Sequence, residues 1–205
     1  MKNPTLFYIY DPMCSWCWGY KNTWQTLQQA LAPLVHIEYK VGGLASDSNV
    51  TMPKQMKTFL QSTWKKIEDE LGSQFNHDFW HNCIPRRSTY PACRAVIIAR
   101  EYHLESQMLE AIQKAYYLEA QNPSNNDVLI QLAQSLEINP VEFKQKLTSD
   151  DINNKLISEI NLIQKMPIQG FPSLVLHLDE QYYPIRIDYQ NFKTTLEEIK
   201  SYLES

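Results

Sequence analysis

The sequence predicts an α/β fold in which the two ends of the chain build a central mixed sheet and a large all-helical segment is inserted between them. Residues 5–41 read as strand, helix and strand, and residues 174–203 read as strand, strand and helix. Between them, apolar residues recur at the three- and four-residue intervals typical of helices. A third observation is the pair Cys14 and Cys17, which falls where the first strand gives way to the first helix.

The N-terminal unit, residues 1–43, is expected to be a β-α-β unit. Its first strand covers residues 5–11, where the apolar run LFYIY is rich in aromatic and β-branched types. An Asp-Pro pair breaks this strand, because the residue before a proline is disfavoured in helical geometry. A helix follows over residues 14–32, and residues 34–41 alternate apolar and polar side chains as a strand does. A crossover helix between two strands predicts a parallel pair with a right-handed connection.

Residues 44–166 are predicted to form the helical insertion, with helical character from Leu44 onward. The segment 73–91, which holds histidines and prolines, is expected to be irregular. In the first helix the residues Met56, Phe59, Leu60 and Thr63 share one face. Six helices are expected, beginning near these residues: Pro53, Ala92, Glu105, Val128, Pro140 and Asp150.

The C-terminal unit, residues 167–205, is expected to be a β-β-α unit. A short apolar strand, Leu174 to Leu178, precedes a polar turn and a second strand at residues 182–187. Two strands joined by so short a turn predict an antiparallel hairpin. Asp188 is predicted to cap the final helix, because a carboxylate can accept the free N–H groups of a first helical turn.

The position of the cysteine pair at a helix start points to thiol chemistry. Free N–H groups and the positive end of the helix dipole stabilise a thiolate there. In a Cys-X-X-Cys pair such a placement lowers a thiol pKa from about 8.5 to roughly 3.5–7.5. We therefore predict that Cys14 is the nucleophile and that Cys17, one turn further along, resolves the mixed disulfide. The alternatives are an inert buried pair and a zinc site; zinc usually takes four ligands, so no metal is expected.

Composition argues against several functional classes. Net charge is −4 and the chain has no basic run, so a nucleic-acid partner is not expected. No glycine-rich nucleotide-binding pattern occurs, and no apolar stretch is long enough to span a membrane. The first apolar run is too short for a signal peptide, so a cytoplasmic protein is expected. Four cysteines in a reducing compartment favour chemistry over structural disulfides.

Three stretches carry a family resemblance: DPMCSWCWG at residues 11–19, PACRA at 91–95 and QGFPSLVL at 169–176. With the order of elements, they make the chain resemble the thioredoxin fold of the DsbA-like family. Within that family it looks closest to the FrnE-like branch of predicted dithiol–disulfide oxidoreductases and isomerases. The resemblance implies exchange on protein, peptide or small-molecule disulfides, with no resident cofactor. The implied partner is a thiol reductant, either glutathione as co-substrate or a thioredoxin system.

The resemblance also implies which residues meet the substrate. Pro172 would form a cis peptide bond beside the cysteines and present the backbone of Phe171 to an extended substrate chain. Trp16 is expected at an apolar rim of the site, whereas Trp18 is expected to pack within the fold.

The alternative function is that of a glutathione-dependent transferase or isomerase of the kappa-class or 2-hydroxychromene-2-carboxylate isomerase type. Those proteins usually carry serine at the first cysteine position and no second cysteine.

The roles of other polar residues stay open at this level. Cys83 and Cys93 could form a second redox pair, although burial in the core is the simpler interpretation. Asp11 is expected to make the Asp-Pro turn, with an effect on Cys14 protonation as the alternative. The pair at residues 86–87, two arginines, is expected at the surface, with binding of an acidic or glutathione carboxylate as the alternative. Arg94, in the PACRA stretch, is a candidate to face the active site.

Overall fold

The computed structural model describes residues 4–204. Four strands occur in this part of the chain: β1 (Thr5–Tyr10), β2 (His36–Val41), β3 (Ser173–Leu178) and β4 (Gln181–Ile185). They form one sheet in the order β2-β1-β3-β4, in which β1 pairs parallel with β2 and antiparallel with β3. Strands β3 and β4 form an antiparallel hairpin. The mixed sheet, the parallel pair and the hairpin expected from the sequence are confirmed.

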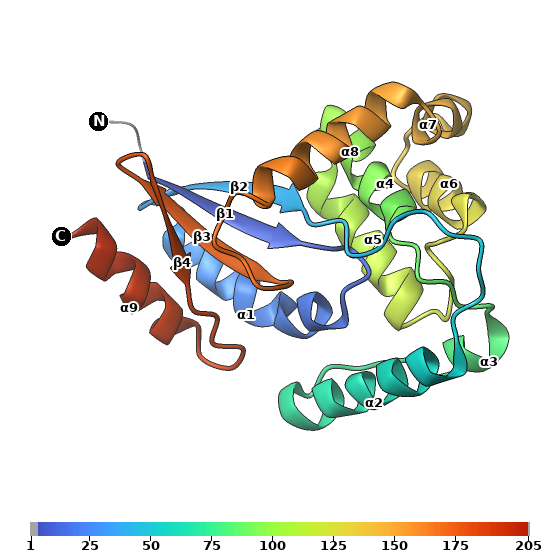
Figure 1. The fold of residues 1–205 in the computed structure, drawn as a ribbon, viewed down its shortest axis with the longest axis horizontal. Coiled ribbons are helices and arrows are strands. Elements are labelled where there is room, and N and C mark those ends of the chain that lie inside the picture. The colour runs from blue at the N-terminus through green and yellow to red at the C-terminus, as the bar shows by residue number, and fades with distance from the viewer. Residues whose placement is uncertain (1–3, 205) are drawn as a thin grey trace.

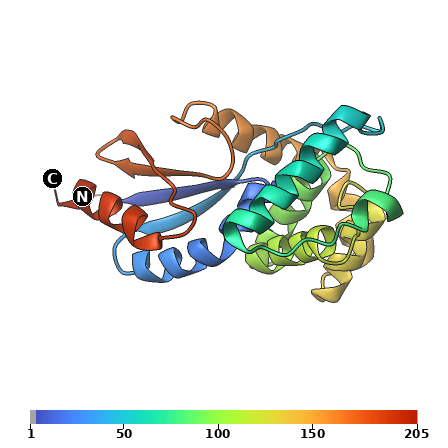
Figure 2. The ribbon, with the colours of Figure 1, turned by 90° about the horizontal axis from the view of Figure 1, so that it is seen from below.

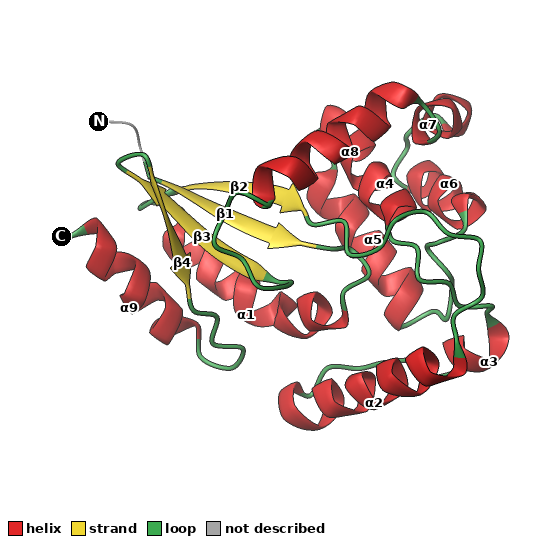
Figure 3. Ribbon diagram, in the orientation of Figure 1, coloured by secondary structure: helices red, strands yellow, loops and turns green. Residues whose placement is uncertain are grey.

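Helices α2 to α8 lie between β2 and β3 along the chain, and they gather beyond one end of the sheet (Figures 1 and 3). The additional helix compared with the six expected is α3, a single turn in the segment predicted to be irregular. No helix of the described residues is long and apolar enough to cross a membrane. The helices span α1 Ser15–Leu31, α2 Lys54–Leu71, α3 Phe79–Asn82, α4 Tyr90–Glu101, α5 Glu105–Tyr117, α6 Asn126–Ser135, α7 Pro140–Leu147, α8 Asp150–Ile163 and α9 Phe192–Leu203.

Both faces of the sheet are covered. Alternate residues of a strand point to opposite faces, and on β1 each set packs against different helices. On β1, Tyr8 and Tyr10 belong to the main core together with residues of α1, and Tyr8 stacks on Trp24 with ring centroids 4.3 Å apart. Phe7 and Ile9 point the other way and pack against the end of α8 and the residues that follow it. In Figure 2, α1 lies beneath the strands and the end of α8 lies above them.

Helix α4 is the centre of the inserted helices. Its residues 92–99 are all buried, and it packs against α5, α6, α7 and α8. A helix buried on all sides needs packing partners on every face, and these four helices supply them. It begins at Tyr90, two residues earlier than expected, after Thr89 at the N-cap position. The start of α4 therefore lies close to the loop that carries the cysteine pair, as the contacts of Thr89 below show.

Two local expectations are wrong. Residues 44–53 form a loop rather than a helix, anchored where the Met52 N–H donates to the Pro85 carbonyl at 2.8 Å. The cap of α9 is Asn191, whose side chain accepts the Lys193 N–H. Asp188 instead accepts the N–H groups of residues 190 and 191, so it shapes the turn before the helix.

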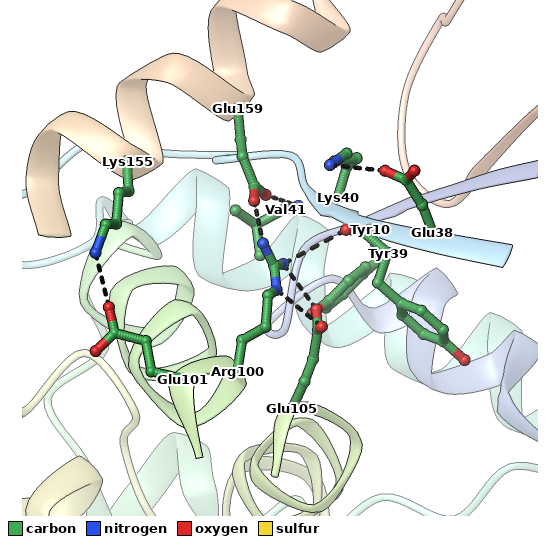
Figure 4. A network of polar contacts seen from close by, with 10 residues as sticks. All are labelled: Tyr10, Glu38, Tyr39, Lys40, Val41, Arg100, Glu101, Glu105, Lys155 and Glu159. Carbon is green, nitrogen blue, oxygen red and sulfur yellow. Dashed lines mark hydrogen bonds and ion pairs between the residues drawn. The ribbon is translucent and has the colours of Figure 1, made fainter. Parts of the chain in front are cut away.

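A polar network joins the inserted helices to the sheet (Figure 4). Arg100 on α4 donates two hydrogen bonds of 2.8 Å to Glu105 and pairs with Glu159 on α8. These carboxylates also bind the sheet: Glu105 accepts the Tyr10 hydroxyl at 3.2 Å, and Glu159 accepts the Val41 N–H at 2.9 Å. Burial would lower the pKa of Arg100, but its bonds to the two carboxylates outweigh burial and raise that pKa.

Candidate active site

Cys14 occupies the N-cap position of α1, with φ −81° and ψ 119°. The turn before the helix places it there: the Asp11 side chain accepts the Met13 N–H at 2.9 Å, and the Asp11 carbonyl accepts the Cys14 N–H at 3.0 Å. Asp11 thus makes the turn predicted from the Asp-Pro pair. The thiol of Cys14 lies at the positive end of α1, whose first turn contains no acidic residue.

The second segment of the site comes from the other end of the chain. The Phe171–Pro172 peptide bond is cis, which confirms the geometry that the resemblance implied for Pro172. The Cys14 thiol donates to the carbonyl of Phe171 at 3.3 Å, although the two residues are 157 positions apart. The loop before β3 therefore faces the sulfur of Cys14.

Cys17 lies behind Cys14 in the first turn of α1. The residue is 1% exposed, against 8% for Cys14, and both thiols are free. Burial raises the pKa of Cys17 well above its usual value, and the adjacent Cys14 thiol adds to the shift. Of the two cysteines, Cys14 is the more exposed, and it lines the cavity described below.

The carboxyl group of Asp11 is completely buried and has a second set of contacts. Its Oδ2 accepts the Leu44 N–H and the Thr89 hydroxyl, each at 2.7 Å, and the thiol of Cys93 at 3.6 Å. Burial raises the pKa of Asp11, while the hydrogen bond from Thr89 opposes the shift. Through this carboxyl group the end of β1 is tied to the loop after β2 and to the start of α4.

The two further cysteines have separate partners. Cys93 is fully buried on α4, as the simpler interpretation predicted, and its thiol meets Asp11. Cys83 is half-buried, and its thiol donates to the Ala120 carbonyl at 3.0 Å. Neither residue lines the cavity beside Cys14. Within residues 4–204, no group of three or more histidine, cysteine or acidic side chains is arranged to hold a metal ion.

A cavity of about 330 Å³ opens beside Cys14, at the lower end of the size range of small-molecule pockets. Most of its wall is apolar, and α2 supplies the largest share. The face of α2 predicted from sequence is therefore the face that covers the site. Its lining comprises Met13, Cys14, Ser15, Trp16, Leu44, Met52, Met56, Phe59, Leu60, Thr63, Trp64, Arg86, Arg87, Thr89, Tyr116 and Phe171.

The predicted substrate-binding residues are distributed unevenly around this cavity. Trp16 and Phe171 line it, whereas Pro172 does not. Trp18 packs within the fold as expected, stacked on Tyr117 at 5.5 Å, with its Nε1 donating to the Gln74 carbonyl at 3.0 Å. Sequence reasoning missed the contribution of Tyr116, because only the packing of α5 brings it to the site.

The positions of three arginines differ from those expected: Arg86 and Arg87 line the cavity, and Arg94 does not. Arg86 and Arg87 therefore belong to the site as well as to the surface. The Arg94 guanidinium instead holds Asp47 through two hydrogen bonds of 2.8 and 2.7 Å, which makes the expectation that Arg94 faces the site wrong.

Gly42 allows Phe171 to lie against the end of β2. A Cβ atom at residue 42 would overlap the Phe171 ring, whereas a Cβ at Gly170 would meet nothing within 4 Å. We expect Gly42→Ala to lower the free energy of unfolding by about 1–3 kcal/mol, because the ring must move. Urea titration measures this, with Gly170→Ala as the matched control expected to change little. Equal effects of the two variants would show that the ring contact is unimportant.

Comparison with known proteins identifies the same fold. A family model described as thioredoxin matches residues 7–195. The structure of a candidate protein disulfide isomerase from Nitrosomonas europaea superposes with a TM-score of 0.85 at 25% identity, covering 99% of this chain and 98% of that chain. The cytosolic disulfide reductase DsbM from Pseudomonas aeruginosa, solved with GSH, shares the fold with a TM-score of 0.75 at 20% identity, covering 98% and 100% of the two chains.

A curated relative carries a different description. The ClpXP adapter protein SpxH from Halalkalibacterium halodurans is 25% identical over 95% of this chain and 63% of its own length. The chain thus spans less than two thirds of that relative. The family model covers most of the chain and the superposed structures share its fold, including the inserted helices. The chain belongs to the DsbA-like family of thioredoxin-fold proteins.

Proposed function

We propose that this protein is a thiol–disulfide oxidoreductase, acting as a reductase or isomerase through Cys14 and Cys17. The observation that carries the proposal is the Cys14 thiol, which lies at a helix start, opposite the Phe171 carbonyl and at the wall of an open cavity. In this proposal residues 1–43 and 167–205 form the redox unit. Residues 44–166 supply most of the cavity wall.

The chemistry is two successive exchanges. The Cys14 thiolate attacks one sulfur of a substrate disulfide, forming a mixed disulfide and releasing the other substrate sulfur as a thiolate. Cys17 then loses its proton and attacks Cys14, which forms the Cys14–Cys17 disulfide and releases the second substrate thiol. The substrate disulfide gains two electrons and the protein pair loses two. A second thiol compound must then reduce the pair.

Glutathione is a suitable thiol for that last step, and the DsbM structure solved with GSH supports this choice. DsbM is described as cytosolic, which supports a cytoplasmic location for this protein.

The glutathione-dependent transferase or isomerase alternative needs no second sulfur. The Cys17 thiol, which lies against Cys14, favours the dithiol mechanism over it.

The proposal is tested by a redox titration. Equilibration with buffers of reduced and oxidised glutathione, followed by acid quenching, alkylation and intact mass measurement, should reveal one two-electron couple. Cys14→Ala and Cys17→Ala should each abolish it. A protein that stays fully reduced in oxidised glutathione would overturn the proposal and favour a binding role such as that of the adapter relatives.

A further inference from the structure

The wall of the Cys14 cavity has an uneven charge. It includes two arginines, Arg86 and Arg87, and no aspartate or glutamate. In residues 4–204 neither arginine forms an ion pair with a carboxylate, although many other cations of the chain do. A cavity that is mostly apolar therefore presents positive charge that no ion pair within the described residues neutralises.

Arg86 is held in a fixed position. Its backbone pairs with Thr51 in an isolated bridge, and its Nη2 donates to the Ser124 carbonyl at 2.7 Å and to the Asn125 side chain at 2.6 Å. Both acceptors are neutral, and the buried Nε has no hydrogen-bond partner. The fold thus fixes the guanidinium against residues 124 and 125, which line a neighbouring hollow together with Asp47 and Asp127, and no carboxylate forms an ion pair with it.

Arg87 is exposed, and no hydrogen bond or ion pair ties it to the described residues. Such a side chain can turn toward an anion that enters the cavity. A guanidinium forms charge-assisted, often bidentate, hydrogen bonds with a carboxylate, and these are stronger than bonds between neutral groups. Asp11, which lies behind the wall, is fully buried, and its carboxyl group accepts hydrogen bonds from Leu44, Thr89 and Cys93 rather than from either arginine.

We propose that the cavity selects small disulfides that carry a carboxylate near the reacting sulfur, with Arg87 as the specificity-determining residue and Arg86 as a fixed second charge. The apolar wall from α2 covers the carbon chain of such a molecule, while the arginines meet its charge. The volume of about 330 Å³ suits a small compound rather than a long peptide. This inference rests on the proposed function and names the substrate class of the same site.

The test uses three disulfides of similar size: 3,3′-dithiodipropionate, which is anionic, 2-hydroxyethyl disulfide, which is neutral, and cystamine, which is cationic. For each one, acid quenching, alkylation and intact mass give the second-order rate constant for oxidation of the reduced Cys14–Cys17 pair. We expect Arg87→Gln to lower the rate constant for the anionic disulfide about 10-fold. The rate constant for the neutral disulfide should change less than about 2-fold, and that for cystamine should not fall.

Lys65→Gln is the matched control, because Lys65 is an exposed cation of α2 that does not line the cavity. It should leave all three rate constants nearly unchanged, while Arg87→Lys should retain part of the preference. An equal fall for all three disulfides, or an equal effect of Lys65→Gln, would overturn the inference while leaving the oxidoreductase proposal intact. If none of the three disulfides oxidises the pair in the wild-type protein but oxidised glutathione does, this inference fails alone; if oxidised glutathione also leaves the pair reduced, the proposed function fails with it.

Discussion

Replacing Cys14 by alanine is expected to lower the rate of disulfide exchange about 10³-fold or more, because it removes the attacking sulfur. Replacing Cys17 by alanine should have a different result. The first exchange still occurs, but no second thiol displaces the substrate, so a mixed disulfide on Cys14 accumulates. Turnover with a small disulfide and a reductant measures the first effect, and intact mass measures the second.

The matched control is Cys83→Ala, because the Cys83 thiol binds the Ala120 carbonyl and does not line the cavity. It should keep near wild-type turnover. Normal turnover by Cys14→Ala would contradict the assignment. An adduct found on Cys83 rather than on Cys14 in the Cys17→Ala protein would also contradict it.

The second exchange should depend on pH in a defined direction. Burial raises the pKa of Cys17, so only a small fraction of its thiol is ionised near neutral pH. The thiolate is the attacking form, and its fraction grows about tenfold per pH unit below the pKa. Decay of the wild-type mixed disulfide, followed by rapid quenching, should therefore accelerate as pH rises. A rate that falls with pH would mean that another step limits the decay.

Local patterns were sufficient for most of the fold. The alternation of β2, the apolar run of β1 and the Asp-Pro break each depend on neighbouring residues, and they correctly placed Cys14 at the start of a helix. The cis bond at Pro172 came from family resemblance, since a proline alone favours the trans form. The predicted N-cap of α9 was wrong because Asp188 and Asn191 are both good capping residues and lie only three positions apart.

The parts that could not be predicted depend on contacts between distant segments. Asp11 meets Thr89 and Cys93 across about eighty residues, so its second role has no local signal. The position of Arg86 follows from its bonds to residues 124 and 125, which come from a different turn. The face of α2 was visible as an apolar stripe, but only packing shows that it covers Cys14 rather than the centre of a helix bundle.

Replacing Arg100 by glutamine is expected to lower the free energy of unfolding by about 2–4 kcal/mol, because it leaves two mostly buried carboxylates without their cation. The side chains of Glu105 and Glu159 are only 20% and 14% exposed, so water can replace the guanidinium poorly. Urea unfolding at pH 7 measures the change. Because the pKa of Arg100 is raised, its guanidinium stays charged from pH 7 to pH 9 and loses its proton only at far higher pH. The loss of unfolding free energy in Arg100→Gln should therefore be the same at pH 9 as at pH 7.

Lys155→Gln is the control for this variant, because Lys155 also bridges two carboxylates, those of Glu101 and Asp151, but is 48% exposed. Exposed ion pairs contribute at most about 1 kcal/mol, so its effect should be small. Tyr10→Phe removes only the hydroxyl bond to Glu105 and should cost about 1 kcal/mol. If Arg100→Gln is no more costly than Lys155→Gln, apolar packing alone holds the inserted helices on the ends of β1 and β2. If Arg100→Gln is the more costly of the two, the ends of β1 and β2, which lead into Asp11 and Gly42, depend on a charge placed by α4. In that case the helical insertion stabilises the turn that holds Cys14 as well as covering it.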